Sequence, residues 1–152
     1  MAQLVGPLPL NVGSTEQRDT TQKEQIGRRA QTVDGSVYVY GLAGAAITAK
    51  ASCKVGATTV GFSGLLMTTN TDEATVCIAG AAFANAEYGW FYEEGGPGVS
   101  VIAAAGLTVG KVGVPTATDG ELDAEGTSTL GSRKYVCVTT ASGGFATVVG
   151  VS

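Results

Sequence analysis

The side chains that most often carry enzyme chemistry are scarce in this chain of 152 residues. It contains no histidine, which excludes a Ser-His-Asp triad, a Cys-His nucleophile and acid–base catalysis by imidazole. The adjacent carboxylates Glu93 and Glu94 are the remaining candidate pair, but neighbouring residues of a strand point to opposite faces. A hydrolase that uses only carboxylates stays open. The sequence predicts a protein that is not an enzyme, without catalytic residues.

Acidic residues alternate along the segment 119–126. They are Asp119, Glu121, Asp123 and Glu125. Alternating carboxylates place oxygens on one side of a loop, which suits calcium. A calcium loop of the EF-hand type has glycine at its sixth position and a bidentate glutamate at its twelfth. Those positions hold Ala124 and Leu130 here. We expect a solvated acidic loop and no metal site, with bound calcium as the alternative.

The charge distribution and the cysteine content further limit the functions and sites that fit this sequence. The net charge is −4, with six basic and four acidic residues in 1–60 and three basic and nine acidic residues in 61–152. An acidic body argues against nucleic-acid binding, which needs clustered lysine and arginine. The cysteines are Cys53, Cys77 and Cys137. Their odd number and their spacing predict buried reduced thiols rather than disulfides or a zinc site.

Neither a membrane span nor an export signal is predicted. No apolar run is long enough to cross a bilayer, so we expect no membrane partner. The first ten residues lack the basic region and compact apolar segment of a signal peptide. Folding in the cytoplasm is therefore expected.

The stretch 88–92 is the densest aromatic run and contains the only tryptophan, Trp90. Apolar runs at 75–79 and 99–104 flank it, with Gly and Pro between, as in strands joined by turns. The segments 37–40, 45–51 and 111–114 are further strand candidates. The hairpin of 135–139 and 145–149 is the strongest. The predicted core side chains are Tyr38, Tyr40, Trp90, Phe91 and Phe145.

With 23 glycines and few charges, this pattern predicts an all-β fold, a small Gly/Ala/Val-rich β-sandwich or β-barrel. We expect two parts, an extended N-terminal arm of residues 1–30 and a β-domain of residues 31–152 that folds without the arm.

The arm has the composition of a docking segment. Two prolines keep its start extended, and residues 14–30 are polar with no apolar stripe, so they form at most a turn of helix. The expected partner-binding residues are the apolar and basic ones of this segment: Leu4, Val5, Leu8, Leu10, Val12, Arg18, Lys23, Arg28 and Arg29. The apolar side chains would pair with a neighbour's sheet edge, and the basic ones would steer the arm toward acidic patches. The alternative is a frayed terminus.

Several short motifs occur in an order that resembles a known family. They are Gln25-Ile26-Gly27-Arg28-Arg29, Asp34-Gly35-Ser36-Val37-Tyr38-Val39-Tyr40 with Gly41 to Ala46, Tyr88-Gly89-Trp90-Phe91-Tyr92, Asp119-Gly120-Glu121-Leu122 and Phe145-Ala146-Thr147-Val148-Val149. In this order the chain resembles the capsid decoration (head-stabilising) proteins of tailed bacteriophages, over about residues 25–152.

The resemblance implies a virion structural protein. Such a protein would bind the major capsid protein on the capsid exterior, after synthesis in the host cytoplasm, and clamp neighbouring capsomers against internal pressure. The family typically has no catalytic site, and no cofactor is expected. A homotrimer is expected, also because the apolar N-terminus has no local core.

Two alternatives belong to other classes. The first is a carbohydrate-binding or adhesion domain, such as a fibre head, in which Trp90, Tyr88 and Tyr92 would be exposed stacking platforms. The second is a tail or neck structural protein, which the sequence does not separate from a capsid role.

Overall fold

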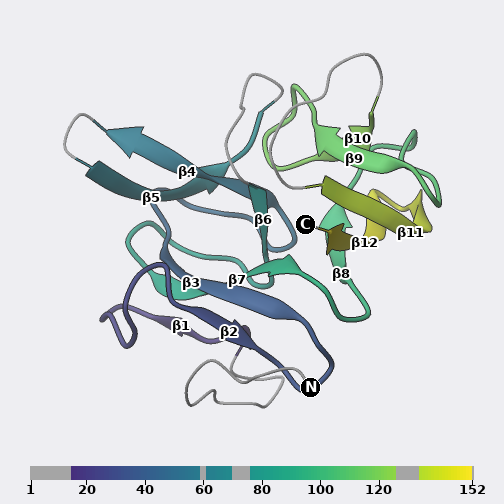
Figure 1. Ribbon diagram of the computed structural model, residues 1–152. Coiled ribbons are helices and arrows are strands. Elements are labelled where there is room, and N and C mark those ends of the chain that lie inside the picture. The colour runs from purple at the N-terminus through teal and green to yellow at the C-terminus, as the bar shows by residue number, and fades with distance from the viewer. Residues whose placement is uncertain (1–14, 59–60, 70–75, 126–133, 152) are drawn as a thin grey trace.

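The chain folds into strands joined by turns and loops. The computed structural model describes residues 15–58, 61–69, 76–125 and 134–151, and within these residues every named element is a β-strand (Figure 1). The predicted all-β class is therefore confirmed, and the two antiparallel sheets pack as a sandwich.

The first sheet contains the N-terminal seven strands. Their bounds are β1 Arg18–Asp19, β2 Arg29–Gln31, β3 Val37–Leu42, β4 Ser52–Thr58, β5 Gly61–Met67, β6 Val76–Ala79 and β7 Tyr88–Glu94. The strand order is β2-β3-β7-β6-β4-β5, and β1 also pairs with β7. Since β3 occupies one edge of β7, β1 and β6 share its other edge, β1 at its start and β6 further along.

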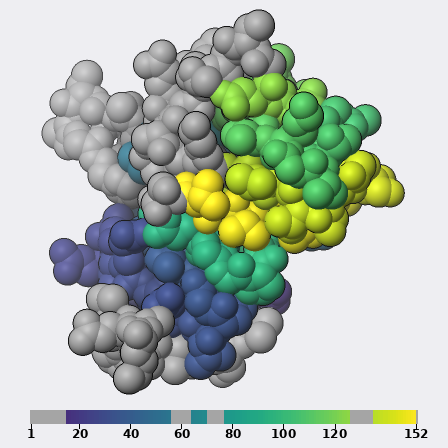
Figure 2. Space-filling view, turned by 45° about the vertical axis from the view of Figure 1, so that its right-hand side comes forward, coloured from purple at the N-terminus to yellow at the C-terminus, as the bar shows by residue number. Residues whose placement is uncertain are grey.

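The second sheet contains the C-terminal strands in the order β10-β9-β11-β12-β8. Their bounds are β8 Val99–Ile102, β9 Val112–Pro115, β10 Leu122–Ala124, β11 Lys134–Ser142 and β12 Phe145–Val151. Figure 2 shows the purple-to-blue N-terminal strands and the green-to-yellow C-terminal strands as adjoining parts of one body.

The main core lies between the sheets. Tyr92 and Ile78 of the first sheet pack against inward-facing residues of the second, among them Val101, Tyr135 and Val148. All five are at most 1% exposed. Apolar burial of this kind stabilises by roughly 25 cal/mol per Å² removed from water.

A second core forms because the first sheet curves until the segment after β3 contacts β5, a closure that we call the curl. Ala43, after β3, bridges Leu65 of β5, and the amide of Gly44 donates to the Leu65 carbonyl at 2.9 Å. Gly64 permits this closure: its φ is +104°, and a Cβ there would lie 2.7 Å from the Gly44 nitrogen. The curl encloses a cluster that includes Phe91 and Cys53.

Among the predicted elements, the terminal hairpin is confirmed as β11 and β12, joined at Gly143 and Gly144, both of positive φ. The predicted strand at 45–51 is wrong. That segment is a loop in which only Ile47 makes an isolated bridge, and Lys50 has a φ of 67°. A left-handed backbone is incompatible with a strand. Ile47 and Ala51 are buried in the second core, whereas Ala45 and Ala46 are exposed.

Candidate functional site

The described part of the predicted arm, residues 15–30, lies on the β-domain. Strand β1 pairs with the start of β7, with Arg18 opposite Gly89. The Arg18 guanidinium donates to the carbonyl of Ala82 at 2.9 Å. Gly89 allows the close approach, because a Cβ there would lie 2.8 Å from the carbonyl oxygen of Gln17. At most a turn of helix was expected over residues 14–30, whereas residues 18–19 form a strand.

Strand β2 crosses the predicted boundary at residue 30 and is fastened by an ion-pair cluster. Arg29 donates from Nε to Glu93 at 2.5 Å and from Nη2 to Glu94 at 2.9 Å. Burial would lower the pKa of Arg29, but its hydrogen bonds to Glu93 and Glu94 and their charges outweigh burial and raise it. Residue 30 therefore lies within a strand that pairs with β3.

A bulge in β7 explains how one arginine reaches two adjacent carboxylates. Tyr38 lies opposite Tyr92 and Val37 opposite Glu94, which leaves Glu93 as an extra residue. A bulge re-aims the side chain that it inserts. Regular alternation along a strand would place Glu93 and Glu94 on opposite faces, so the sequence pattern did not predict this cluster.

The N-terminal segment also covers an aromatic row of the first sheet. Tyr40 and Trp90 lie opposite each other on β3 and β7 and pack edge to face, 5.2 Å between ring centroids. The Lys23 amide donates to the Tyr40 hydroxyl at 3.0 Å. Trp90 is only 6% exposed, and Ala30 of β2 completes this third core cluster.

The other predicted arm residues divide into two groups. Arg28 pairs with Glu24, four residues earlier, so the arginines at 18, 28 and 29 all contact groups of their own chain. Leu4, Val5, Leu8, Leu10 and Val12 lie outside the described residues.

The predicted core residues differ in burial. Phe91 is fully buried in the curl, and Tyr38 is partly buried beside the main core. Phe145 is 43% exposed, so its assignment to the core is wrong. Ala146 and Val148 point inward, and alternation along the strand turns Phe145 outward, where the Lys50 ammonium lies 4.5 Å from the ring centroid.

The outer face of the second sheet carries apolar side chains, which we call the valine face. It comprises Val112, Val136, Val138, Val149 and Val151. Register places the valines at 112, 136 and 149 in one row across β9, β11 and β12. Those at 138 and 151 are 42% and 41% exposed. An apolar sheet face at the surface is typical of an interface.

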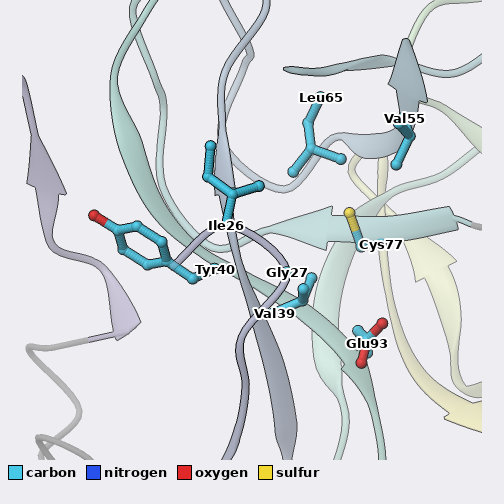
Figure 3. A pocket seen from close by; sticks show the side chains of 9 residues that line it. Ile26, Gly27, Val39, Tyr40, Val55, Leu65, Cys77 and Glu93 are labelled. Atoms are coloured by element: carbon cyan, nitrogen blue, oxygen red, sulfur yellow. The ribbon is translucent and has the colours of Figure 1, made fainter. Parts of the chain in front are cut away.

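An apolar pocket of about 140 Å³ opens at one end of the curl (Figure 3). Val39, Val55 and Leu65 line it, with Cys77 and Glu93 among its other residues. The Glu93 carboxylate is bonded to Arg29. The pocket has the size and lining for an apolar side chain, and nothing in its arrangement activates a nucleophile or a water.

Two of the four carboxylates in the acidic loop accept local hydrogen bonds. Glu121 accepts from the Thr116 hydroxyl at 2.9 Å, and Asp123 accepts from the amide of Ala124 at 2.7 Å. Within the described residues, no group of three or more His, Cys, Asp or Glu side chains is arranged to hold a metal ion.

All three cysteines are buried free thiols. Cys53 and Cys77 lie directly opposite each other on β4 and β6. Burial raises the pKa of Cys53 to about 12 and also raises the pKa of Cys137. Because the thiolate is the reactive form, Cys53 and Cys137 have low reactivity at neutral pH.

Comparison with protein-family models, with curated proteins and with solved structures found no match for this chain. Among the described residues, no helix has the length and hydropathy needed to cross a membrane.

Proposed function

We propose that this chain is a virion structural protein that binds the outside of a bacteriophage capsid and clamps neighbouring capsomers. The anchorage of the N-terminal segment carries the proposal. Residues 18–19 and 29–31 pair with the body, so the fourteen residues before Thr15 leave from a fixed point. A clamp needs such a fixed point, because load on the arm must pass into the folded body.

The chemistry of this leading segment suits the role. It contains five large aliphatic residues and no charged side chain. Extended apolar segments add readily to an exposed sheet edge of a partner. The partner in this proposal is the major capsid protein, and the protein is made in the host cytoplasm before joining the capsid exterior.

The valine face supplies a second contact surface. Stable interfaces bury on the order of 800 Å² of surface on each partner. The anchoring side chains of a fourteen-residue arm alone would bury less than this area. We place the contact between copies on this face, in a homotrimer. Sedimentation at micromolar concentration should give a trimer, and a Val136→Lys variant should give monomer. A monomeric wild-type chain would contradict the trimer.

The burial of the aromatic residues does not favour the adhesion alternative. Tyr92 is fully buried, Trp90 is nearly so, and Tyr88 is partly buried and stacks on Tyr40, whereas a stacking platform must face solvent. A tail or neck position uses the same surfaces, and cryo-electron microscopy of the particle distinguishes it from the capsid exterior.

Co-sedimentation with purified capsids of the encoding phage tests the proposal. We expect the full chain to bind, a chain beginning at Thr15 to lose binding, and Val138→Lys to weaken it at least about tenfold, since burying an unpaired charge costs more than 1.4 kcal/mol. Val33→Lys is the matched control, because Val33 is 83% exposed in the turn between β2 and β3 of the first sheet. Wild-type binding by the shortened chain would overturn the role of the arm.

A further inference from the structure

The two sheets share one arrangement of strands. In the first sheet β3, β7, β6, β4 and β5 are neighbours in that order, and in the second the order is β8, β12, β11, β9 and β10. Each sheet also closes on itself through an equivalent parallel bridge, Ala43 with Leu65 and Ala103 with Leu122. In both, the amide that follows the alanine donates to the leucine carbonyl at 2.9 Å. The domain therefore contains two repeats of one unit, β3 to β7 and β8 to β12.

The loop after the first strand of each repeat supports this equivalence. Residues 43–48 and 103–108 both run through an alanine, three small residues, a large aliphatic residue and a threonine. The aliphatic residues, Ile47 and Leu107, are buried in the two larger core clusters. Three residues later, Lys50 and Gly110 have φ values of 67° and 81°. Because strand pairing, sequence pattern and backbone agree, residues of one repeat can be assigned equivalents in the other.

The core of the second repeat is completed by the first. The main core contains the equivalents of most residues inside the curl and, in addition, Ile78 and Tyr92 of the first repeat. Tyr92 packs beside Tyr135, with ring centroids 6.3 Å apart, and its hydroxyl accepts from the Gly150 amide at 3.1 Å. The face of one repeat thus covers the curl of the next.

The pocket at the end of the curl is the equivalent place in the first repeat. Tyr135 lies opposite Gly150 in β11 and β12, and by the register of β6 and β7 their equivalents are Cys77 and Glu93. Both equivalents line the pocket (Figure 3). Val55 lines it as well and is 42% exposed. Where Tyr92 fills the second repeat, the described residues of the first leave this pocket of about 140 Å³.

The valine face is the second repeat's equivalent of the face that carries Tyr92. Val136 lies opposite Val149 in β11 and β12, as Ile78 lies opposite Tyr92 in β6 and β7. In an array of repeats each unit covers its neighbour, and the terminal units retain one uncovered face each. Here these are the valine face at one end and the curl with its pocket at the other.

We propose that the valine face of one copy docks on the pocket of a second copy, repeating between chains the contact that joins the two repeats within a chain. Val149 then enters the position that Tyr92 occupies in the second repeat. The contact is heterologous, because two different surfaces meet, and such contacts close into a ring when the rotation between subunits permits it. The inference rests on the association of copies in the proposed function and names the surface that the valine face meets.

The chemistry of the two surfaces fits this contact. Val149 is smaller than Tyr92 and has no hydroxyl, so it needs no partner such as the Gly150 amide. Glu93 occupies the place of Gly150, and its carboxylate is bonded to Arg29. The valine face therefore meets no unpaired charge when it covers the pocket.

Complementation between two charged variants tests the proposal by sedimentation at micromolar concentration. Val55→Lys places a charge at the pocket, and Val136→Lys places one on the valine face. Each variant alone should associate at least about tenfold more weakly than wild type, because docking would bury an unpaired charge. Mixed in equal amounts, they should form a one-to-one dimer, since the intact valine face of one meets the intact pocket of the other. Val33→Lys is the control and should associate like wild type.

Wild-type association of Val55→Lys would overturn the proposal, because the valine face would then meet some other surface. A monomeric mixture, or a monomeric wild type, would overturn it as well. Failure of an intact oligomer to bind capsids would contradict the capsid role alone.

A second measurement needs no variant. In a mixture of isotope-labelled and unlabelled wild-type chains, nuclear Overhauser contacts should join the Val149 methyls of one copy to the Leu65 methyls of another. Contacts between the Val149 methyls of two copies would instead show that like faces meet and would overturn the head-to-tail contact.

Discussion

The inner face of the first sheet is covered in two different ways. Tyr92 lies under the second sheet, among inward-facing residues of several hydrogen-bonded strands. Trp90, two residues earlier on β7, lies under the N-terminal segment, which attaches through two short strands, the Arg29 cluster and single hydrogen bonds. The two rings are almost equally buried, at 0% and 6% exposure.

The two coverings therefore bury their aromatic rings to a similar extent but differ in how firmly they are attached to the first sheet. The second sheet is held against the first by the main core. Residues 15–27, which belong to the segment that covers Trp90, have mainly polar side chains. A segment with few buried apolar contacts opens at a lower free energy than a core sheet. We expect the N-terminal cover to open locally before the sandwich unfolds, which suits a segment that leads into the proposed docking arm.

The largest effect is expected at the aromatic row itself. Trp90→Ala should lower the free energy of unfolding by about 3–5 kcal/mol, through lost burial and a cavity. Urea denaturation followed by circular dichroism measures this, with Trp90→Phe as the milder control. A loss below about 1 kcal/mol would mean that the N-terminal cover collapses onto the space and is not a fixed structure.

Removing the arginine that fastens β2 should have an intermediate effect. Arg29→Met should destabilise by roughly 1–2 kcal/mol, because Glu93 is left buried without its cation while the partly exposed arginine is itself weakly bound. A double-mutant cycle with Glu93→Gln isolates the pair. Additive effects in that cycle would show that the two side chains do not couple.

Alkaline titration should separate the two covers. Burial raises the pKa of both Tyr40 and Tyr92 above the ordinary 10.0, so the stability that they contribute is complete below pH 10 and is lost as pH rises above it. Cys53, raised from 9.0 to about 12, adds a loss that begins near pH 9. Absorbance at the tyrosinate band in single-tyrosine-to-phenylalanine variants should show Tyr40 ionising before global unfolding and Tyr92 only with it. Simultaneous ionisation would contradict separate opening.

The smallest effect is expected at the surface contact of Phe145. Lys50→Met should cost about 0.5 kcal/mol by removing a partly exposed cation–π contact, without moving either cover. Thermal unfolding resolves a shift of this size when it is repeated with Lys111→Met as the surface control, because Lys111 is exposed. A decrease in the free energy of unfolding as large as that of Arg29→Met would contradict the assignment of Lys50 to a surface contact.

Sequence patterns predicted the strands whose residues alternate or carry β-branched and aromatic side chains, such as β7 and the β11–β12 hairpin. They did not predict β1, because two residues carry no period and their pairing depends on Gly89 and on the partner strand. They misplaced Phe145, since a shift of one residue after a Gly-Gly turn reverses the face of every side chain. The Arg29 cluster depends on a bulge in β7 that no local sequence pattern predicts.

Residues 15–31 belong to the folded body, in contrast to residues 1–14, which we propose as the docking arm. Tryptophan fluorescence during thermal unfolding of two shortened chains tests this division most directly. A chain beginning at Thr15 should keep the blue-shifted emission of Trp90 and the full-length melting temperature within a few degrees. A chain beginning at Ala30 should show red-shifted emission and a clearly lower melting temperature, because Tyr40 and Trp90 lose their cover. Identical emission and melting in both chains would contradict the claim and return residues 15–29 to a dispensable arm.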